Sequence, residues 1–200
     1  NGGRPVEAVV AEAVRGGVSM VQLRDPDAPT RSLVELARAL AAQLRPLAIP
    51  FIVNDRVDVA LASNADGVHV GQKDMDARDV RAMVGEDRIV GLSVADSEEL
   101  EASRAALGAV DYLGVGPVYA TATKADAGNA IGLAGIEWMR RATGLPLVAI
   151  GGIDAARTEA ILRAGADGVA VVSAIMNAPD PAGASAEILA AARRGARERD

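Results

Sequence analysis

The chain has 200 residues, of which 50% are hydrophobic and 24% are charged, so it can form one globular domain with a sizeable core and is not a disordered chain. Its net charge of −6 argues against binding to a nucleic-acid backbone, which needs a basic surface. The absence of cysteine excludes disulfides, thiolate zinc sites and cysteine nucleophiles. His69 is the single histidine, which excludes sites built from two imidazoles.

The chain carries no pattern that is typical of a membrane or secreted protein. No apolar run approaches the roughly 18 residues of a transmembrane helix, and no basic start followed by an apolar stretch indicates a signal peptide. We therefore expect a cytoplasmic protein that acts on small molecules and binds neither nucleic acid nor a membrane. No linker interrupts the chain, which predicts a single domain over residues 1–200 with a polar tail after about residue 193. No pattern indicates an oligomeric state.

Short apolar segments and alanine-rich amphipathic segments alternate along the whole chain. The apolar segments are rich in Val and Ile, as in strands of a parallel sheet that are buried on both faces. They lie at 20–23, 50–53, 67–70, 88–92, 111–115, 146–150 and 168–172. The other segments place apolar residues three or four apart, which predicts helices. They lie at 5–15, 30–44, 56–62, 77–84, 97–106, 135–141, 155–163 and 182–194.

This alternation of strands and helices predicts an α/β protein. Seven strands and eight helices, with a helix first, predict a (βα)8 TIM barrel whose first strand is absent from the chain. An open doubly wound sheet is disfavoured, because neither G-x-G-x-x-G nor G-x-x-x-x-G-K-[ST] occurs. A weak repeat of Ala-Asp-Gly-Val at 65–68 and 166–169 favours repeated βα units, although Gly and Asp are common in any tight turn.

Polar residues that follow the predicted strands are the candidate site residues, because a TIM barrel carries its active site at the carboxyl ends of its strands. Along the chain these are Gln22, Arg24, Asn54, Asp55, Asp74, Ser93, Thr121, Thr123, Lys124, Gly151, Gly152 and Ser173. Arg24 is placed at the end of a buried strand, and burying an arginine is costly unless it meets an anion. We therefore expect this end of the barrel to bind an anionic substrate.

The last two loops have a clear rationale for binding phosphate. Gly151 and Gly152 expose backbone N–H groups, and Val172 and Ser173 open a short helix whose N-terminus favours an anion. These loops occupy the recurrent phosphate position of the fold. A tight turn and a helix cap are the alternatives, and the position favours phosphate.

The segment after the fifth strand carries two hydroxyls and an ammonium, Thr121, Thr123 and Lys124. This combination suits phosphate oxygens, whereas the alternative is a solvated surface loop. A connection of this length in a compact domain is often functional.

Asp55 and Asp74 end neighbouring strands, where two carboxylates can share a Mg²⁺ ion with substrate phosphate oxygens. Each also precedes a predicted helix, so a helix cap is the alternative, and the sequence leaves both open. His69 lies at a strand end on the face opposite Val68 and Val70. We expect a structural rather than a catalytic histidine there.

Seven segments, in order and at matching spacing, resemble the thiamine-phosphate synthase family. They are 21–24, 51–55, 67–74, 114–119, 121–124, 150–153 and 165–175, and they cover nearly the whole chain. The combination of Val-Asn-Asp-Arg, His-Val-Gly-Gln-x-Asp and Thr-x-Thr-Lys is specific, whereas each motif alone is weak.

The resemblance implies a transferase that joins 4-amino-2-methyl-5-hydroxymethylpyrimidine diphosphate, hereafter the pyrimidine diphosphate, to thiazole phosphate, with release of pyrophosphate. It implies Mg²⁺ held by Asp55 and Asp74. The residues implied for the pyrimidine diphosphate are Gln22, Arg24, Asn54, Ser93 and Lys124. Those implied for the thiazole phosphate are Thr121, Thr123, Gly152, Val172 and Ser173.

The chemistry implied by the resemblance is a dissociative substitution. Pyrophosphate leaves first, and the thiazole nitrogen attacks the pyrimidine-stabilised carbocation. Such a reaction needs cations around the leaving group and no general base or protein nucleophile. It makes Lys124, Arg24 and Ser93 the expected catalytic residues, with Mg²⁺ as cofactor. Pro26 stands where the family usually has a lysine, which removes one phosphate contact.

Three alternatives share parts of this pattern. A thiazole tautomerase-like paralogue is disfavoured, because such proteins lack the two aspartates and the Thr-x-Thr-Lys segment and use a histidine near that loop. A catalytically weakened protein that binds thiazole or thiamine phosphate is supported by Pro26 and by the absent first strand. Another phosphate-binding barrel enzyme, such as a sugar-phosphate isomerase, would use Asp55 and Asp74 as acid and base and would not depend on Mg²⁺.

Overall fold

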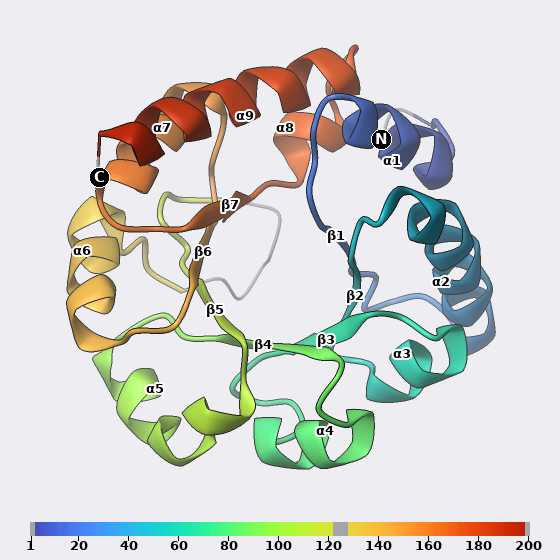
Figure 1. Ribbon diagram of the computed structural model, residues 1–200, viewed down its shortest axis with the longest axis horizontal. Coiled ribbons are helices and arrows are strands. Elements are labelled where there is room, and N and C mark those ends of the chain that lie inside the picture. Colours follow the sequence, from blue (N-terminus) through green and yellow to red (C-terminus); the bar gives the residue numbers. More distant parts are fainter. Residues whose placement is uncertain (1–2, 122–127, 199–200) are drawn as a thin grey trace. The chain divides into compact units, whose positions relative to one another are not determined.

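The structure is a computed structural model that describes residues 3–121 and 128–198. It consists of two compact units, each built from parallel strands and helices (Figure 1). The β1–β4 unit comprises residues 19–93 and 104–111, and the β5–β7 unit comprises residues 1–18, 94–103 and 112–200. Within the described ranges, no helix is both long and apolar enough to cross a membrane.

In the β1–β4 unit, four parallel strands pair in chain order, and the helices lie on one side of them (Figure 1). The strands are β1 (Val21–Leu23), β2 (Phe51–Asn54), β3 (Gly67–Val70) and β4 (Ile89–Ser93). The helices are α2 (Thr30–Leu44), α3 (Val57–Ser63) and α4 (Ala77–Val84), with 3-10 helices at Arg45–Leu47 and Arg104–Ala109. Phe51, Ile52 and Val53 are fully buried, as expected of a strand covered on both faces.

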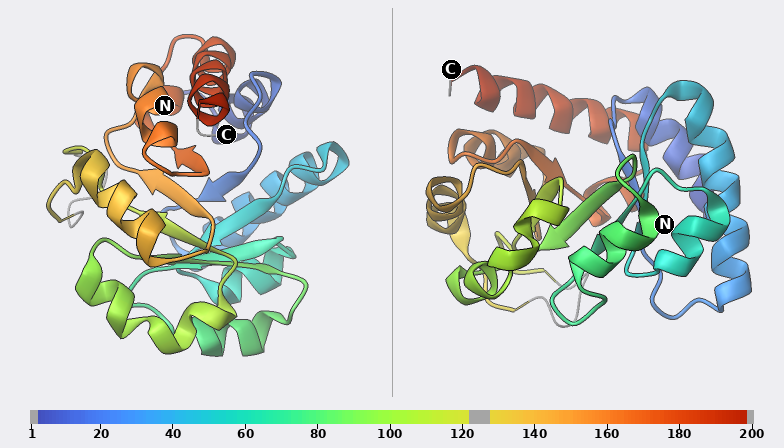
Figure 2. Two further views of the ribbon diagram at one scale, coloured as in Figure 1. Left: turned by 60° about the vertical axis from the view of Figure 1, so that its left-hand side comes forward. Right: turned by 60° about the horizontal axis from the view of Figure 1, so that its bottom comes forward.

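In the β5–β7 unit, three parallel strands pair in chain order. They are β5 (Tyr112–Val115), β6 (Leu147–Ile150) and β7 (Gly168–Ala170). The helices are α1 (Val6–Arg15), α5 (Ser97–Ala102), α6 (Gly132–Ala142), α7 (Ala155–Arg163), α8 (Ser173–Met176) and α9 (Pro181–Arg197). Figure 2 shows α9 against α1 and α7, where its backbone approaches theirs closely. A Cβ atom on Gly195 would lie 2.4 Å from the Glu159 carbonyl oxygen.

The seven predicted strands are all present in the described residues, with boundaries that differ by at most two positions. Two expectations about helices are wrong. The helix expected over 97–106 ends at Ala102 and is followed by the 3-10 helix at Arg104–Ala109. The polar tail expected after about residue 193 is helical as far as Arg197, because Arg194 pairs with Glu159 at 2.8 Å and holds this end of α9 against α7.

The weak sequence repeat has a structural basis that explains why an aspartate precedes several strands. In each copy, and also at Asp111 before β5, the aspartate carboxylate accepts the backbone N–H at or near the start of the preceding strand. These bonds join Asp66 to Phe51 (2.9 Å), Asp111 to Val90 (2.7 Å) and Asp167 to Leu147 (2.9 Å). Each aspartate thus ties a turn to its neighbouring strand at the amino-terminal edge of its sheet. The repeat therefore reflects repeated βα units rather than a general preference of turns.

Candidate functional site

A cavity of about 150 Å³ lies at the carboxyl ends of β1 and β2. It is lined by Arg24, Asp25, Pro26, Asn54, Asp55 and Arg56. We call the predicted residues of this edge the β1–β4 site; they are Gln22, Arg24, Asn54, Asp55, Asp74 and Ser93. The argument that Arg24 is buried in a strand is wrong, because β1 ends at Leu23 and Arg24 is exposed. Its place in the cavity beside Asp55 nevertheless puts a cation at the predicted position.

Asp55 follows β2 directly and has an unusual backbone conformation. Its φ of 60° lies in the left-handed region, which costs energy for a residue with a side chain and often marks a functional position. Two backbone hydrogen bonds hold this conformation. The Asp55 N–H donates to the His69 carbonyl oxygen at 2.8 Å, and the Arg56 N–H donates to the Asn54 carbonyl oxygen at 2.7 Å. The turn directs the chain away from β2 before α3 begins.

Asp74 belongs to a turn that follows β3. Its Oδ2 accepts the Gly71 N–H at 2.8 Å, so the carboxylate is fixed relative to the strand end. The helix-cap alternative is wrong for both aspartates. Asp76, not Asp74, caps α4 by accepting the Arg78 N–H, and α3 begins after Arg56 without a side-chain cap.

Asp55 and Asp74 are the predicted residues of this edge that suit a hard cation, and Asp25 lines the same cavity as Asp55. They follow two paired strands, since Asn54 lies opposite His69 in the β2–β3 register. The described part of the chain contains no group of three or more His, Cys, Asp or Glu that could hold a metal ion. Mg²⁺ commonly takes only one or two carboxylates and completes its shell with water and substrate phosphate. The donor set therefore fits Mg²⁺ that binds together with a phosphorylated substrate.

Ser93 ends β4 and is held at both its side chain and its main chain. Its Oγ lies 2.9 Å from Nε2 of His69, and its carbonyl oxygen accepts the Gln72 side-chain amide at 2.8 Å. The sequence predicted a structural histidine and missed this partner. The register of β3 and β4 would have indicated this contact. His69 pairs with Gly91, and Ser93 lies two residues after Gly91, on the same face of the sheet as His69.

Arg56 is a further residue of the cavity that the sequence did not single out as a site residue. Its guanidinium donates to both carboxylate oxygens of Asp58, at 2.9 and 2.6 Å, and to Oγ1 of Thr30 at 3.0 Å. It thereby joins the start of α2 to the start of α3. The hydrogen bond from Arg56 lowers the pKa of the Asp58 carboxyl below its usual range.

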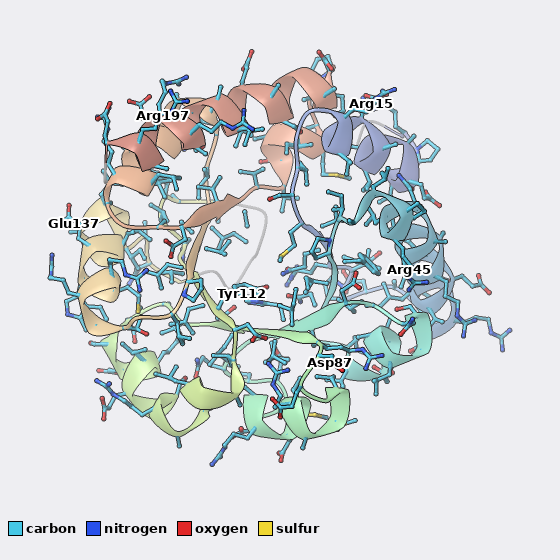
Figure 3. The ribbon with its side chains drawn as sticks, in the orientation of Figure 1. Arg15, Arg45, Asp87, Tyr112, Glu137 and Arg197 are labelled. Carbon is cyan, nitrogen blue, oxygen red and sulfur yellow. The ribbon has the colours of Figure 1, made fainter. Side chains whose placement is uncertain are left out.

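A larger cavity of about 480 Å³ lies at the opposite, amino-terminal ends of the strands of this unit. Arg45 and Asp87 on its rim are labelled in Figure 3. Its arginines are engaged by the chain itself: Arg45 donates to the Asn64 carbonyl oxygen at 3.1 Å, and Arg88 to Oδ1 of Asn64 at 3.0 Å. This end of a βα unit usually serves stability, and the contacts agree with that role.

In the β5–β7 unit, the turn after β6 requires glycine at two consecutive positions. Gly151 and Gly152 have φ of 102° and 63°. A Cβ atom would lie 2.6 Å from Cβ of Pro117 at the first position and 2.8 Å from the Ala120 carbonyl oxygen at the second. The segment after β5 therefore packs directly on the glycine pair. Tyr119 N–H completes this contact by donating to the Gly151 carbonyl oxygen at 3.1 Å.

Arg157, in the first turn of α7, holds the same two segments from outside. Its guanidinium donates to the Gly152 carbonyl oxygen and lies over the Tyr119 ring, 4.6 Å from the ring centre. Attraction between a guanidinium and an aromatic face is favourable. Arg157 was not among the predicted site residues, because nothing in the spacing of 151–157 indicates a contact with Tyr119.

The remaining predicted residues of this unit lie after β5 and β7. Val172 and Ser173 are exposed, and α8 begins at Ser173, as the predicted short helical turn requires. Thr121 is half-buried. Thr123 and Lys124 lie outside the described residues, so their roles stay predictions. We call Thr121, Gly151, Gly152, Val172 and Ser173 the β5–β7 site.

Comparison with known proteins identifies the family to which the chain belongs. Residues 1–175 match the family model described as thiamine monophosphate synthase. Thiamine-phosphate synthase from Azorhizobium caulinodans is 57% identical over 86% of this chain and 80% of its own length. The enzyme of the same name from Xanthobacter autotrophicus is 58% identical over 94% of this chain and 88% of its own length.

A solved structure extends the agreement to the fold. Thiamine phosphate pyrophosphorylase from Pyrococcus furiosus is 37% identical, covers 96% of this chain and 91% of its own, and matches with a TM-score of 0.87. The predicted α/β TIM-barrel fold class is confirmed, with seven strands in the described residues. The chain therefore belongs to the thiamine monophosphate synthase family and is a transferase that forms thiamine phosphate.

Proposed function

We propose that the β1–β4 site binds the pyrimidine diphosphate with Mg²⁺, that the β5–β7 site binds the thiazole phosphate, and that pyrophosphate leaves before the thiazole nitrogen attacks. The observation that carries the proposal is the cavity of about 150 Å³ that holds Arg24 and Asp55 together. A diphosphate with a bound cation needs both a positive side chain for its oxygens and a carboxylate for the cation.

Asp55 and Asp74 would hold Mg²⁺, and the side chains around them would hold the diphosphate. When bound, Mg²⁺ supplies positive charge that stabilises the pyrophosphate leaving group. Arg24 donates to diphosphate oxygens, and the Ser93 hydroxyl and the Asn54 amide add neutral donors. Gln22 lies one strand position from buried Leu23, on the exposed face of β1, and binds the same substrate. Lys124, predicted from the sequence, brings a second cation to the leaving group.

The β5–β7 site binds the second substrate mainly through the backbone. The segment after β5 packs on the Gly151-Gly152 turn and fixes its main chain, whose N–H groups would bind the phosphate. Gly152, Val172 and Ser173 would contact the thiazole phosphate, and Thr121 and Thr123 would add hydroxyls. Holding the thiazole in place before pyrophosphate leaves favours attack by its nitrogen over attack by water.

The test is to incubate the protein with both substrates and Mg²⁺, oxidise the product and measure thiochrome fluorescence. We expect a signal that disappears with EDTA and returns when Mg²⁺ is added in excess. Activity that persists in EDTA would contradict the Mg²⁺-dependent mechanism. Binding of thiazole phosphate without turnover would indicate instead a weakened binding protein, the alternative that Pro26 favours.

A further inference from the structure

His69 occupies a position between two residues of the β1–β4 site. Its ring nitrogen Nε2 lies 2.9 Å from Oγ of Ser93, and its carbonyl oxygen accepts the N–H of Asp55 at 2.8 Å. His69 is 7% exposed, and its neighbours Val68 and Val70 are fully buried. One residue of the central strand β3 thus contacts the expected substrate ligand on β4 and the expected metal ligand after β2.

A histidine at this depth is not explained by packing alone. An apolar side chain would fill the same space without the cost of burying two ring nitrogens. The adjacent β4 position is Gly91, which has no side chain beside the ring. Ser93, two residues further along β4, presents its hydroxyl to Nε2 on the same face. The arrangement directs the imidazole to the Ser93 hydroxyl.

We propose that His69 is a positioning residue: its Nε2–H donates to Oγ of Ser93 and thereby leaves the Ser93 hydroxyl proton to donate to the diphosphate. The proposal rests on the role of Ser93 in the proposed function. A serine hydroxyl rotates and can both donate and accept. Diphosphate oxygens only accept, so Ser93 must donate to them and accept from its protein partner. A donor fixed in a buried ring sets that direction before substrate binds.

A double-mutant cycle with Ser93→Ala separates positioning from a general structural role. His69→Leu removes the donor, whereas His69→Gln keeps an amide donor at nearly the place of Nε2. We expect His69→Leu to lower kcat/KM for the pyrimidine diphosphate by about tenfold, which is the upper end for one neutral hydrogen bond, and His69→Gln to restore it to within about threefold. In the Ser93→Ala background, His69→Leu should change kcat/KM by less than about twofold, because its partner is already absent.

The single histidine of the chain allows a second measurement that does not depend on activity. The ¹⁵N chemical shifts of the His69 ring distinguish a protonated from an unprotonated Nε2 in the folded protein. We expect a protonated Nε2 whose shift changes in Ser93→Ala. The same spectra, together with the melting temperature of each variant, show whether the variant folds. If His69→Leu does not fold, the comparison is made with His69→Gln.

The outcomes separate failure of this proposal from failure of the proposed function. An inactive wild-type protein contradicts the proposed function and this inference with it. An active wild-type protein with a fully active Ser93→Ala variant leaves the transferase activity intact, but it removes Ser93 from diphosphate binding and overturns the role of His69. Equal losses from His69→Leu in both backgrounds, or an unprotonated Nε2, overturn it as well.

Discussion

The β1–β4 site and the β5–β7 site fix their functional groups in different ways. In the first, side chains are held by hydrogen bonds at the strand ends: Asp74 by the Gly71 N–H, and Ser93 by His69. In the second, the main chain itself is shaped, by two glycines with positive φ and by the segment that packs on them. An exposed arginine, Arg157, then holds these segments together.

This difference follows from what each site is expected to bind. A diphosphate with Mg²⁺ requires carboxylates and cations at defined places, which side chains provide. A single phosphate can be bound by backbone N–H groups, which requires close approach and therefore glycine. Replacing a side chain should consequently be most damaging in the β1–β4 site, and adding one should be most damaging in the β5–β7 site.

The largest effect is expected from removing a carboxylate of the β1–β4 site. Asp55→Asn and Asp74→Asn keep the shape of each side chain and remove its negative charge, so the Mg²⁺ that neutralises the leaving group would bind poorly. Each should lower kcat by about 100-fold or more, measured by thiochrome fluorescence across a Mg²⁺ titration. Asp79→Asn, at an exposed position of α4, is the matched control. If Asp55→Asn turned over substrate at the wild-type rate at limiting Mg²⁺, Asp55 would not be a ligand of the metal ion.

The next effect is expected from adding one methyl group to the β5–β7 site. In Gly152→Ala the new Cβ meets the Ala120 carbonyl oxygen and strains a backbone φ of 63°. We expect KM for thiazole phosphate to rise about tenfold and KM for the pyrimidine diphosphate to stay within about twofold. Gly144→Ala is the control, because a Cβ there meets nothing within 4 Å. A uniform loss of kcat with both KM values unchanged would argue against a role of Gly152 in phosphate binding.

Candidate site residues could be selected from the sequence, whereas the contacts that hold them could not. Asp55, Asp74 and Arg24 carry chemistry in their side chains, so their position after predicted strands was sufficient to select them. The bond from His69 to Ser93 depends on strand register, which single-strand patterns do not define. Arg157 contacts Tyr119 from a different βα unit, and no local pattern indicates such a contact.

The fold shows the same division between local and long-range information. Strand positions followed from runs of Val and Ile, and α2, α4 and α7 have the bounds that their apolar spacing predicts. The end of α9 could not be predicted from such a local pattern, because its last turn is held by ion pairs of Arg194 with Glu159 and of Glu198 with Arg163. A polar tail and a paired helical turn have the same composition, and the partner on α7 decides between them.

A smaller effect is expected from Arg157, which contacts the β5–β7 site from outside. Arg157→Met removes the bond to the Gly152 carbonyl oxygen and the contact with Tyr119 while keeping an unbranched side chain. We expect KM for thiazole phosphate to rise about three- to fivefold with little change in kcat. Arg141→Met, at an exposed position of α6, removes the same charge elsewhere in the unit. An equal response to both variants would mean that long-range charge, and not the contact with the glycine turn, sets the affinity.

The smallest effect is expected from the pair of Arg56 and Asp58 beside the β1–β4 site. Since the hydrogen bond from Arg56 lowers the pKa of Asp58, the charged carboxylate stabilises the folded state. That contribution is complete above the ordinary carboxyl pKa and is lost as the pH falls through the lowered value. Asp58 is largely exposed, so Asp58→Asn should cost at most about 0.5 kcal/mol of unfolding free energy at neutral pH. Urea unfolding of both proteins should show the difference shrinking below about pH 3. A difference that grows on acidification would mean that the pair does not stabilise the fold.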